Sequence, residues 1–245
     1  MDVIAVTAAA GLRSRMEALD LLSNNLANTS TGGYKADREF YSLFQGAEAS
    51  LDGSQPTTLP HIKKQWVDFK QGLLQPTGNP LDLALTQKGF FAINGPSGPL
   101  YTRNGSFKTS STGVLTTMDG YPIRGVGGKP ITANSESPIE ISSSGSVQQG
   151  GESLGQLEIV DFRDPSILSK VGSNYFRPTD PKVNPTLVSD PAVQQGELEA
   201  SNVSPAESAV RLVELMRQYE MLQKAVSVTV DMNKRATDDV ARVTS

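Results

Sequence analysis

The sequence contains no cysteine, and this absence excludes three kinds of chemistry. Without thiols the chain forms no disulfide, has no thiol nucleophile and offers no thiolate ligand to zinc. It has a single histidine, His61, so a histidine-rich metal site is also excluded. Its serines have no base marked beside them, as a nucleophilic site would require. We therefore expect no enzymatic activity, no metal, no cofactor and no small-molecule substrate.

Long apolar runs and basic stripes are missing as well. No run approaches the roughly 20 apolar residues that cross a bilayer, so we expect no membrane insertion. The formal net charge is −4, which makes nucleic acid an unexpected partner. The start, MDVIAVTAAAGLRSR, is apolar, but Asp2 precedes its apolar run and Arg13 and Arg15 follow it. A Sec signal peptide has the opposite order, so export would follow a route without a cleaved Sec signal.

The first 27 residues carry apolar or small residues at alternating spacings of four and three. These positions are Ala5, Ala9, Leu12, Met16, Leu19, Ser23 and Leu26, and Leu22 widens the row. The spacing predicts a helix with a heptad seam. At about 1.5 Å per residue this helix is roughly 38 Å long.

The C-terminal segment predicts a longer helix. Ser204-Pro205-Ala206-Glu207 places serine at the N-cap, proline at the first helical position and glutamate three residues later, which is a capping box. The 3-4 spacing then continues at Leu212, Leu215, Tyr219, Leu222, Val226, Thr229, Asn233, Ala236, Val240 and Val243. This helix is roughly 58 Å long, so an antiparallel pair would leave part of its seam without a partner from its own chain.

The middle of the chain, about Gln75 to Gln195, is typical of short antiparallel strands. Leu81, Leu83 and Leu85 alternate with other residues at period two, which predicts a half-buried strand. Asn104-Gly105 and Asp119-Gly120 are dipeptides that tight hairpin turns favour, so we expect a hairpin at each. Further strands are expected at Gly89–Ile93, Pro138–Ser142, Gly155–Phe162 and near Tyr175. Such strands favour an antiparallel sandwich or open barrel.

Together these patterns predict an α+β protein, in which the terminal helices pair as a coiled-coil-like stem beside a central antiparallel all-β domain. The expected boundaries are 1–35 for the N-terminal helix and its Asn/Gly-rich turn, 36–75 for a largely extended linker, 76–195 for the β domain and 196–245 for the C-terminal helix. Within the linker, Phe40 to Phe44 fits either a continued helix or a strand.

The stretch LSNNLANTSTGGYKA, from Leu22 to Ala36, combines a helix end with an unusual set of asparagines. Asn28 to Gly33 has the composition of a helix terminus, with Gly32 or Gly33 in the left-handed conformation. Asn24 and Asn25 come while the helix is still running. Asparagines at such positions suit directional hydrogen bonds to another backbone. In an antiparallel helix pair, Asn28 and Asn202 would lie at the same pole.

Four segments in order resemble the flagellar rod and hook protein family. They are SNNLANTSTGGYKADREFY, NPLDLALTQKGFF, YTRNGSF and GELEASNVSPAESAVRLVELMRQYEMLQKA, and the resemblance covers nearly the whole chain. Tyr34 stands where phenylalanine is common in the family, and Gly32 where other residues often occur. The resemblance implies a non-enzymatic axial protein of the basal body, exported by the flagellar type III apparatus, with its terminal helices in the inner tube of the rod. The implied partners are further copies, other rod subunits and the export apparatus.

Within the family, the moderate length and compact β region favour a proximal-rod over a distal-rod member. Two other classes remain alternatives: a secreted β-rich binding or adhesion domain, and a hydrolase that uses loop carboxylates. Because Ser23, Thr229 and Asn233 interrupt the seams, we expect the terminal segments to order fully only on assembly. The candidate subunit-interaction residues are Leu12, Met16, Leu19, Leu22, Asn24, Asn25, Leu26, Asn28, Gly33, Asn202, Leu212, Leu215, Tyr219, Leu222 and Val226.

Overall fold

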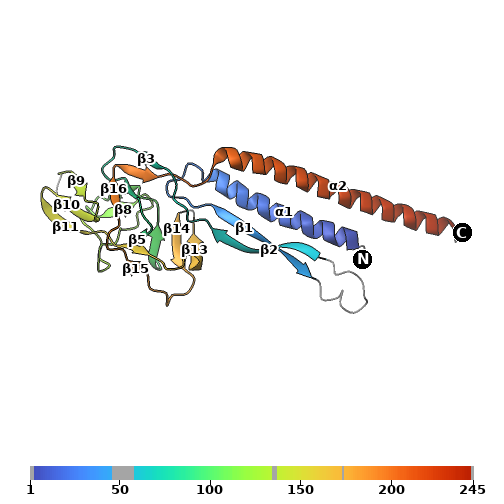
Figure 1. Ribbon diagram of the computed structural model, residues 1–245, viewed down its shortest axis with the longest axis horizontal. Helices are drawn as coiled ribbons and strands as arrows, with labels where there is room; N and C mark the ends of the chain where they lie inside the picture. The colour runs from blue at the N-terminus through green and yellow to red at the C-terminus, as the bar shows by residue number, and fades with distance from the viewer. Residues whose placement is uncertain (1–2, 46–57, 134–136, 173, 244–245) are drawn as a thin grey trace. The chain divides into compact units, whose positions relative to one another are not determined.

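The computed structural model describes residues 3–45, 58–133, 137–172 and 174–243 (Figure 1). The chain forms two compact units, and each unit combines segments that are distant in sequence. Unit 1 consists of Met1–Ala27, Asp37–Val67 and Ser204–Ser245, and unit 2 consists of Asn28–Ala36 and Asp68–Val203. The prediction of two terminal helices and an antiparallel β region in an α+β protein is confirmed.

Unit 1 contains both helices, α1 (Val3–Ala27) and α2 (Pro205–Val243). The capping residues act as predicted, because Pro205 is the first helical residue and the Glu207 amide donates to Ser204 Oγ at 3.4 Å. Figure 1 shows that α2 continues well past the start of α1. Neither helix is long and apolar enough, over its described residues, to cross a membrane.

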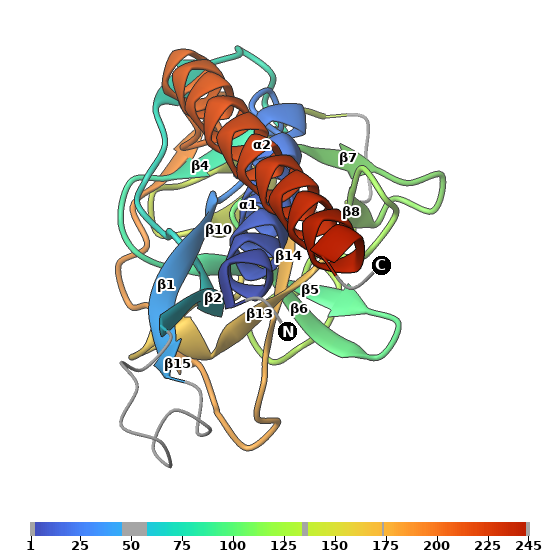
Figure 2. The ribbon, with the colours of Figure 1, turned by 90° about the vertical axis from the view of Figure 1, so that its right-hand side faces the viewer.

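A long hairpin completes unit 1. Strands β1 (Asp37–Gln45) and β2 (Thr58–Val67) pair antiparallel, from Asp37 opposite Val67 to Gln45 opposite Thr58, with a register shift between Phe40 and Tyr41. Residues Phe40 to Phe44 therefore form a strand and do not continue a helix. Figure 2 shows the hairpin and the two helices of unit 1 from the end of α2.

The described part of unit 2 is built from short strands and one 3-10 helix. Its elements are β3 (Leu74–Pro76), β4 (Leu83–Leu85), β5 (Phe90–Gly95), β6 (Gly98–Thr102), β7 (Phe107–Thr109), β8 (Leu115–Thr117), β9 (Ile139–Ile141), β10 (Ser146–Gln149), β11 (Glu152–Gln156), β12 (Ile159–Asp161), η2 (Pro165–Ile167), β13 (Leu168–Val171), β14 (Tyr175–Pro178), β15 (Thr186–Leu187), β16 (Val193–Gln195) and β17 (Glu197–Glu199). The largest sheet is six-stranded, in the order β13-β14-β6-β5-β12-β15, and its strands pair antiparallel.

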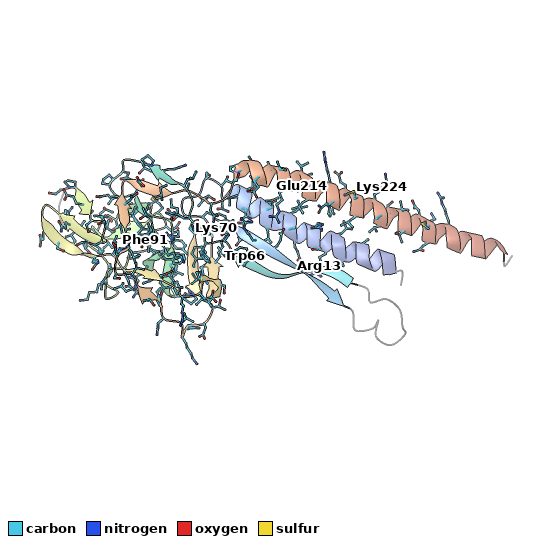
Figure 3. All side chains as sticks on the ribbon, viewed as in Figure 1. Arg13, Trp66, Lys70, Phe91, Glu214 and Lys224 are labelled. Carbon is cyan, nitrogen blue, oxygen red and sulfur yellow. The ribbon has the colours of Figure 1, made fainter. Side chains whose placement is uncertain are left out.

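One apolar core holds the small sheets of unit 2 together. Phe91 on β5 has no exposed surface and meets Phe107 edge to face at 5.3 Å between ring centroids. Figure 3 places Phe91 among the densely packed side chains of this unit. The other buried members of the cluster are Leu83, Leu85, Ile93, Leu100, Leu115, Ile123, Ile131, Ile139, Ile141, Val147, Leu157, Ile159 and Val193.

The two predicted hairpin turns have different outcomes. At Asp119-Gly120 the prediction is confirmed: Gly120 has a φ of +86° and the Thr117 amide donates to Tyr121 O at 2.9 Å across the turn. At Asn104-Gly105 it is wrong, because β6 pairs with β5 and β14 while β7 pairs with β8. The glycine has another use there. A Cβ on Gly105 would lie 1.6 Å from Leu83 O, so the absence of a side chain permits the close approach of β4.

Strand β4 also differs from its prediction. Leu83, Ala84 and Leu85 are all buried, so both faces of the strand are covered. The period-two pattern indicated a half-buried strand, but Ala84 is small enough to be enclosed on the second face. The Gly155–Phe162 strand is divided into β11 and β12, which belong to different sheets.

Candidate subunit-interaction site

The first group of predicted residues lies along the contact between α1 and α2 in unit 1. Ala18, Leu22 and Leu215 are buried together, and Leu19 and Leu212 pack against them. Further from this cluster, a Cβ on Gly11 would lie 3.3 Å from Leu222. Because residue numbers rise along α1 as they fall along α2, the two helices run antiparallel.

On α2 the predicted row is the row that faces inward. Leu215 is 5% exposed and Thr229 is buried, while Leu212, Tyr219, Leu222 and Val226 are half-buried. Each of the intervening positions on the opposite side of the helix is more open. The 3-4 spacing therefore located the inward face of α2 correctly from Leu212 to Thr229, whereas Asn233 of the same predicted row is exposed.

On α1 the buried row is displaced from the predicted one. Its buried residues are Ala8, Gly11, Ser14, Ala18, Leu22 and Asn25. By contrast, Met16 is 53% exposed, and Leu12, Leu19 and Leu26 are half-buried. Two of the small residues, Gly11 and Ala18, lie against Leu222 and Leu215 of α2, and small side chains permit a close approach of two helices. Leu22 is the large α1 residue that is buried in this contact, whereas Leu12, Met16, Leu19 and Leu26 are left at its margin or exposed.

The opposite face of α2 also carries apolar side chains. Val210, Val213, Met221, Val228 and Met232 are between 50% and 65% exposed. Their successive separations of three, eight, seven and four place them on one face of the helix, away from Leu215 and Leu222. We call these five residues the outer row. Glu214 and Lys224, labelled on α2 in Figure 3, are exposed polar residues of the same helix.

Asn25 joins helix α1 to the hairpin within unit 1. Its Nδ2 donates to Asp37 O at 2.8 Å, and its Oδ1 accepts from the Asp37 amide at 2.8 Å. The side chain therefore pairs with a backbone in both directions, as predicted for an asparagine in this stretch, although the backbone belongs to the same chain. On the other helix, Arg211 forms an ion pair with Glu39 of β1. Asn24 is exposed on α1.

Asn28 and Gly33 belong to unit 2. Asn28 makes the local bonds predicted for a helix terminus, since its backbone oxygen accepts from the Thr31 amide and its Oδ1 from Thr31 Oγ1, both at 3.2 Å. Gly33 is left-handed, with a φ of +67°, but it lies six residues beyond the end of α1. A Cβ there would lie 2.3 Å from the Asn104 amide nitrogen. Gly33 is therefore required for close packing rather than as the cap of the helix.

Asn202 bonds to two backbone segments of unit 2, 34–36 and 68–70. Its Oδ1 accepts from the Ala36 amide at 2.8 Å, and its Nδ2 donates to Asp68 O at 2.7 Å and to Lys70 O at 3.0 Å. Its own amide donates to Tyr34 O at 3.3 Å. The side chain is thus used within its own chain.

Beside Asn202 lies a buried group of charges that sequence reasoning missed. Lys35 Nζ is 2.5 Å from Glu199 Oε1, and both side chains have no exposed surface. Arg103 Nη1 is 3.4 Å from Glu199 Oε2, and the Gly72 amide donates to Glu199 Oε1 at 2.9 Å. Lys35 Nζ also donates to Lys70 O at 2.7 Å. We call the buried residues Lys35, Arg103 and Glu199, together with the half-buried Asn202, the buried polar cluster.

Burial dominates the electrostatics of this cluster. It lowers the pKa of Lys35 below its ordinary value, and the adjacent Glu199 carboxylate acts in the opposite direction. Burial likewise lowers the pKa of Arg103, again opposed by Glu199. A buried charge without its partner is strongly destabilising, so these groups depend on one another. A signal was present in the sequence, since Lys35 and Glu199 both lie inside segments that carry the family resemblance.

Two protein-family models match parts of this chain. The family model described as flagellar hook protein FlgE/F/G D1 domain matches residues 84–149, and the model described as flagellar basal body rod FlgEFG protein C-terminal matches residues 194–239. The chain is 34% identical to the flagellar basal-body rod protein FlgF of Caulobacter vibrioides, over 92% of each chain. The chain belongs to the flagellar basal-body rod protein family. It is also 32% identical to the rod protein FlgG of the same bacterium, over 96% of this chain and 97% of that one.

Within this rod-family chain, the predicted interaction residues fall into two groups. The α1 and α2 residues and Asn25 lie in unit 1, whereas Asn28, Gly33 and Asn202 lie in unit 2. Among the described residues, no group of three or more histidine, aspartate or glutamate side chains is arranged to hold a metal ion.

Proposed function

We propose that this chain is a structural, non-enzymatic axial subunit of the bacterial flagellar basal-body rod, which polymerises through its terminal helices and transmits torque for motility. Membership of the rod family supports the role. The observation that carries the mechanism is the outer row of α2, which leaves apolar side chains exposed on the face opposite Leu215 and Leu222. A helix with apolar residues on two opposite faces gains stability when both are covered.

Helix length supports the same proposal. Helix α2 has 39 residues and α1 has 25, so they are about 58 Å and about 38 Å long. The part of α2 beyond α1 has no α1 surface against it. Copies that meet head to tail through such surfaces form heterologous interfaces, which build helical filaments when they do not close into rings. In the assembled rod we expect α1 and α2 to form a coiled-coil-like stem with the helices of neighbouring copies.

The proximal rod is our preferred position for this chain, by its likeness to FlgF. The distal-rod protein FlgG is the alternative, because the identities to the two Caulobacter vibrioides proteins are 34% and 32%. The partners would be further copies, neighbouring rod proteins and the flagellar export apparatus, with export that needs no cleaved Sec signal. A density map of the basal body from the bacterium that carries this chain decides the position, because it shows which axial layer contains the chain.

Substitutions in the outer row test assembly. In the native bacterium, we expect the double variant Val213→Lys/Val228→Lys to abolish rod incorporation and swimming. A charged lysine side chain cannot be buried between apolar helices without a partner. The matched control is Glu214→Gln/Lys224→Gln, which changes two exposed polar residues of the same helix and should leave swimming intact. Purified Val213→Lys/Val228→Lys protein should keep the wild-type unfolding midpoint of unit 2. Normal swimming by this variant would refute assembly through the outer row.

Order of the terminal helices before assembly gives a second test. We expect amide exchange in residues 1–30 and 206–245 to be faster in the purified monomer than in assembled rods. Strong protection of both segments in the monomer would contradict this expectation. It would favour the rival function, a β-rich binding or adhesion domain whose helices serve only as cover.

A further inference from the structure

The chain passes between unit 1 and unit 2 after residues 27, 36, 67 and 203. Three of the residues at or near these passages, all in unit 2, are bonded in a closed triangle. The Ala36 amide donates to Asn202 Oδ1 at 2.8 Å, Asn202 Nδ2 donates to Asp68 O at 2.7 Å, and the Asp68 amide donates to Ala36 O at 2.8 Å. Segments that leave unit 2 at different points of the sequence are thereby joined at one point.

The charges of the buried polar cluster join the same segments a second time. Lys35 stands next to Ala36, and Glu199 stands three residues before Asn202. The Glu199 carboxylate accepts from Lys35, from Arg103 and from the Gly72 amide, and so links the segments 33–36, 68–72 and 199–202. The backbone adds to this link, because the Gly33 amide donates to Glu199 O at 2.6 Å.

Asparagine side chains can bond to backbone groups nearby in sequence, as in a turn. Asn202 does the opposite. Its side-chain bonds to Ala36, Asp68 and Lys70 span 166, 134 and 132 positions of the chain. The ion pair between Lys35 and Glu199 spans 164 positions. The cluster thus closes the fold of unit 2 over most of its length.

We propose that the buried polar cluster is a tether that fixes the chain passages of unit 2 to one point, with Asn202 as its positioning residue. Segment 28–36 stays docked only while the segment around Glu199 and Asn202 is in place. If the Glu199 segment moved away, Lys35 would remain buried without the Glu199 carboxylate. A force applied to the chain at any of the three joined passages, after residues 36, 67 or 203, acts on the bonds of Asn202 before it acts on the apolar core. One further step rests on the proposed function: in a rod, the tether would carry torque between the terminal helices and the β-rich unit.

Hydrogen exchange on the full-length purified chain tests the tether. In Asn202→Ala we expect exchange at the Ala36 amide to accelerate roughly 10- to 100-fold, because this amide loses its acceptor. Exchange at the Asp68 amide, which donates to Ala36 O, should accelerate as well, because the opened triangle no longer holds the two segments together. The Ala92 amide, which donates to Glu158 O in the core sheet, should change by less than about threefold. The matched control is Asn94→Ala, which removes a half-buried asparagine with a 3.4 Å bond to Gly128 O and should leave Ala36 and Asp68 unaffected.

A second variant covers the case in which Asn202→Ala does not fold. Asn202→Asp keeps an acceptor for the Ala36 amide but places a carboxylate oxygen against the carbonyls of Asp68 and Lys70. We expect faster exchange at Asp68 than at Ala36 in this variant. Unchanged exchange at Asp68, or equal acceleration at Asp68 and Ala92, would overturn the tether.

The outcomes separate the tether from the proposed function. Exchange is measured on the monomer and does not depend on rods. A chain that shows the expected exchange pattern but never enters a basal body would overturn the proposed function and leave the tether standing.

Discussion

The two units of this chain bury their apolar residues to very different extents. In unit 2, Phe91, Ile93 and their neighbours form a closed core with essentially no exposed surface. In unit 1, the described part of the helix pair has a small buried cluster around Leu215, while the outer row of α2 remains exposed. Unit 2 also has exposed apolar residues, such as Leu73 and Leu187, but they lie on separate segments, whereas those of α2 form a row along one helix face.

The charged residues show the same contrast. Unit 2 encloses the ion pair of Lys35 and Glu199 completely, and unit 1 carries the pair of Arg13 and Glu17 on an exposed helix face, where the two side chains are 84% and 38% exposed. A buried charge is costly to leave alone, and an exposed one is not. Substitutions in unit 2 should therefore have large effects in the monomer, and those in unit 1 should act mainly on assembly.

The largest effect is expected from Glu199→Leu. It leaves Lys35 and Arg103 buried without a carboxylate, which should lower the free energy of unfolding of unit 2 by about 3–5 kcal/mol. Urea denaturation followed by circular dichroism measures the loss. The matched control is Glu140→Leu on β9, an exposed glutamate whose replacement should change stability by no more than about 0.5 kcal/mol. Equal losses in both variants would remove the contrast between buried and exposed charge.

Gly33→Ala should follow in size. Alanine at a φ of +67° is strained by about 1 kcal/mol, and its Cβ would also meet the Asn104 amide nitrogen at 2.3 Å. Gly78→Ala is the matched control, because Gly78 has a φ of +72° and no atom within 4 Å of an added Cβ. We expect Gly33→Ala to lose at least about 1 kcal/mol more than Gly78→Ala in thermal unfolding. Equal losses would mean that the backbone of residues 103–104 moves aside without cost.

Sequence reasoning succeeded where a pattern depends on one element. The inward row of α2, the cap at Ser204 and the turn at Asp119-Gly120 all follow from local spacing or local hydrogen bonds. It failed where the role of a residue depends on contacts with a segment that is distant in the sequence. Asn104-Gly105 accommodates Leu83 instead of turning a hairpin, and the bonds of Lys35 and Asn202 span well over a hundred positions.

The face of α1 shows the same limit within a single helix. Its heptad spacing favoured the large residues Leu12, Met16 and Leu19, yet the small residues Gly11 and Ala18 lie against α2. Which face of a helix is buried depends on the surface of the partner helix. The heptad pattern of α1 alone gives no information about the surface of α2. Whether the larger α1 residues contact another copy stays a prediction.

In unit 1, Leu215→Ala and Val228→Ala separate the two faces of α2. Leu215 is buried against Ala18 and Leu22, so its truncation should cost about 2 kcal/mol, the low end for a leucine whose surroundings can partly close. Val228 is half exposed, and its truncation should cost less than about 0.5 kcal/mol in the monomer. The only tryptophan, Trp66, lies in unit 1 and is 42% exposed, so its fluorescence follows this unit during denaturation. Equal costs would show that the inward row is not packed in the monomer.

The smallest effect is expected from Glu17→Gln, which removes the exposed ion pair with Arg13 on α1. The two residues are four apart on one helix, with Nε and Oε1 3.3 Å apart, and such pairs contribute about 0.3–0.5 kcal/mol. Trp66 fluorescence at low and high salt checks the value, because an exposed pair is screened by salt and the difference from wild type should vanish near 1 M. The neighbouring exposed residue Asp20, changed to Asn, serves as the control for loss of charge. A loss above about 1 kcal/mol that persists at high salt would mean that α1 is already held as tightly as the core of unit 2, and the contrast between the units would fail.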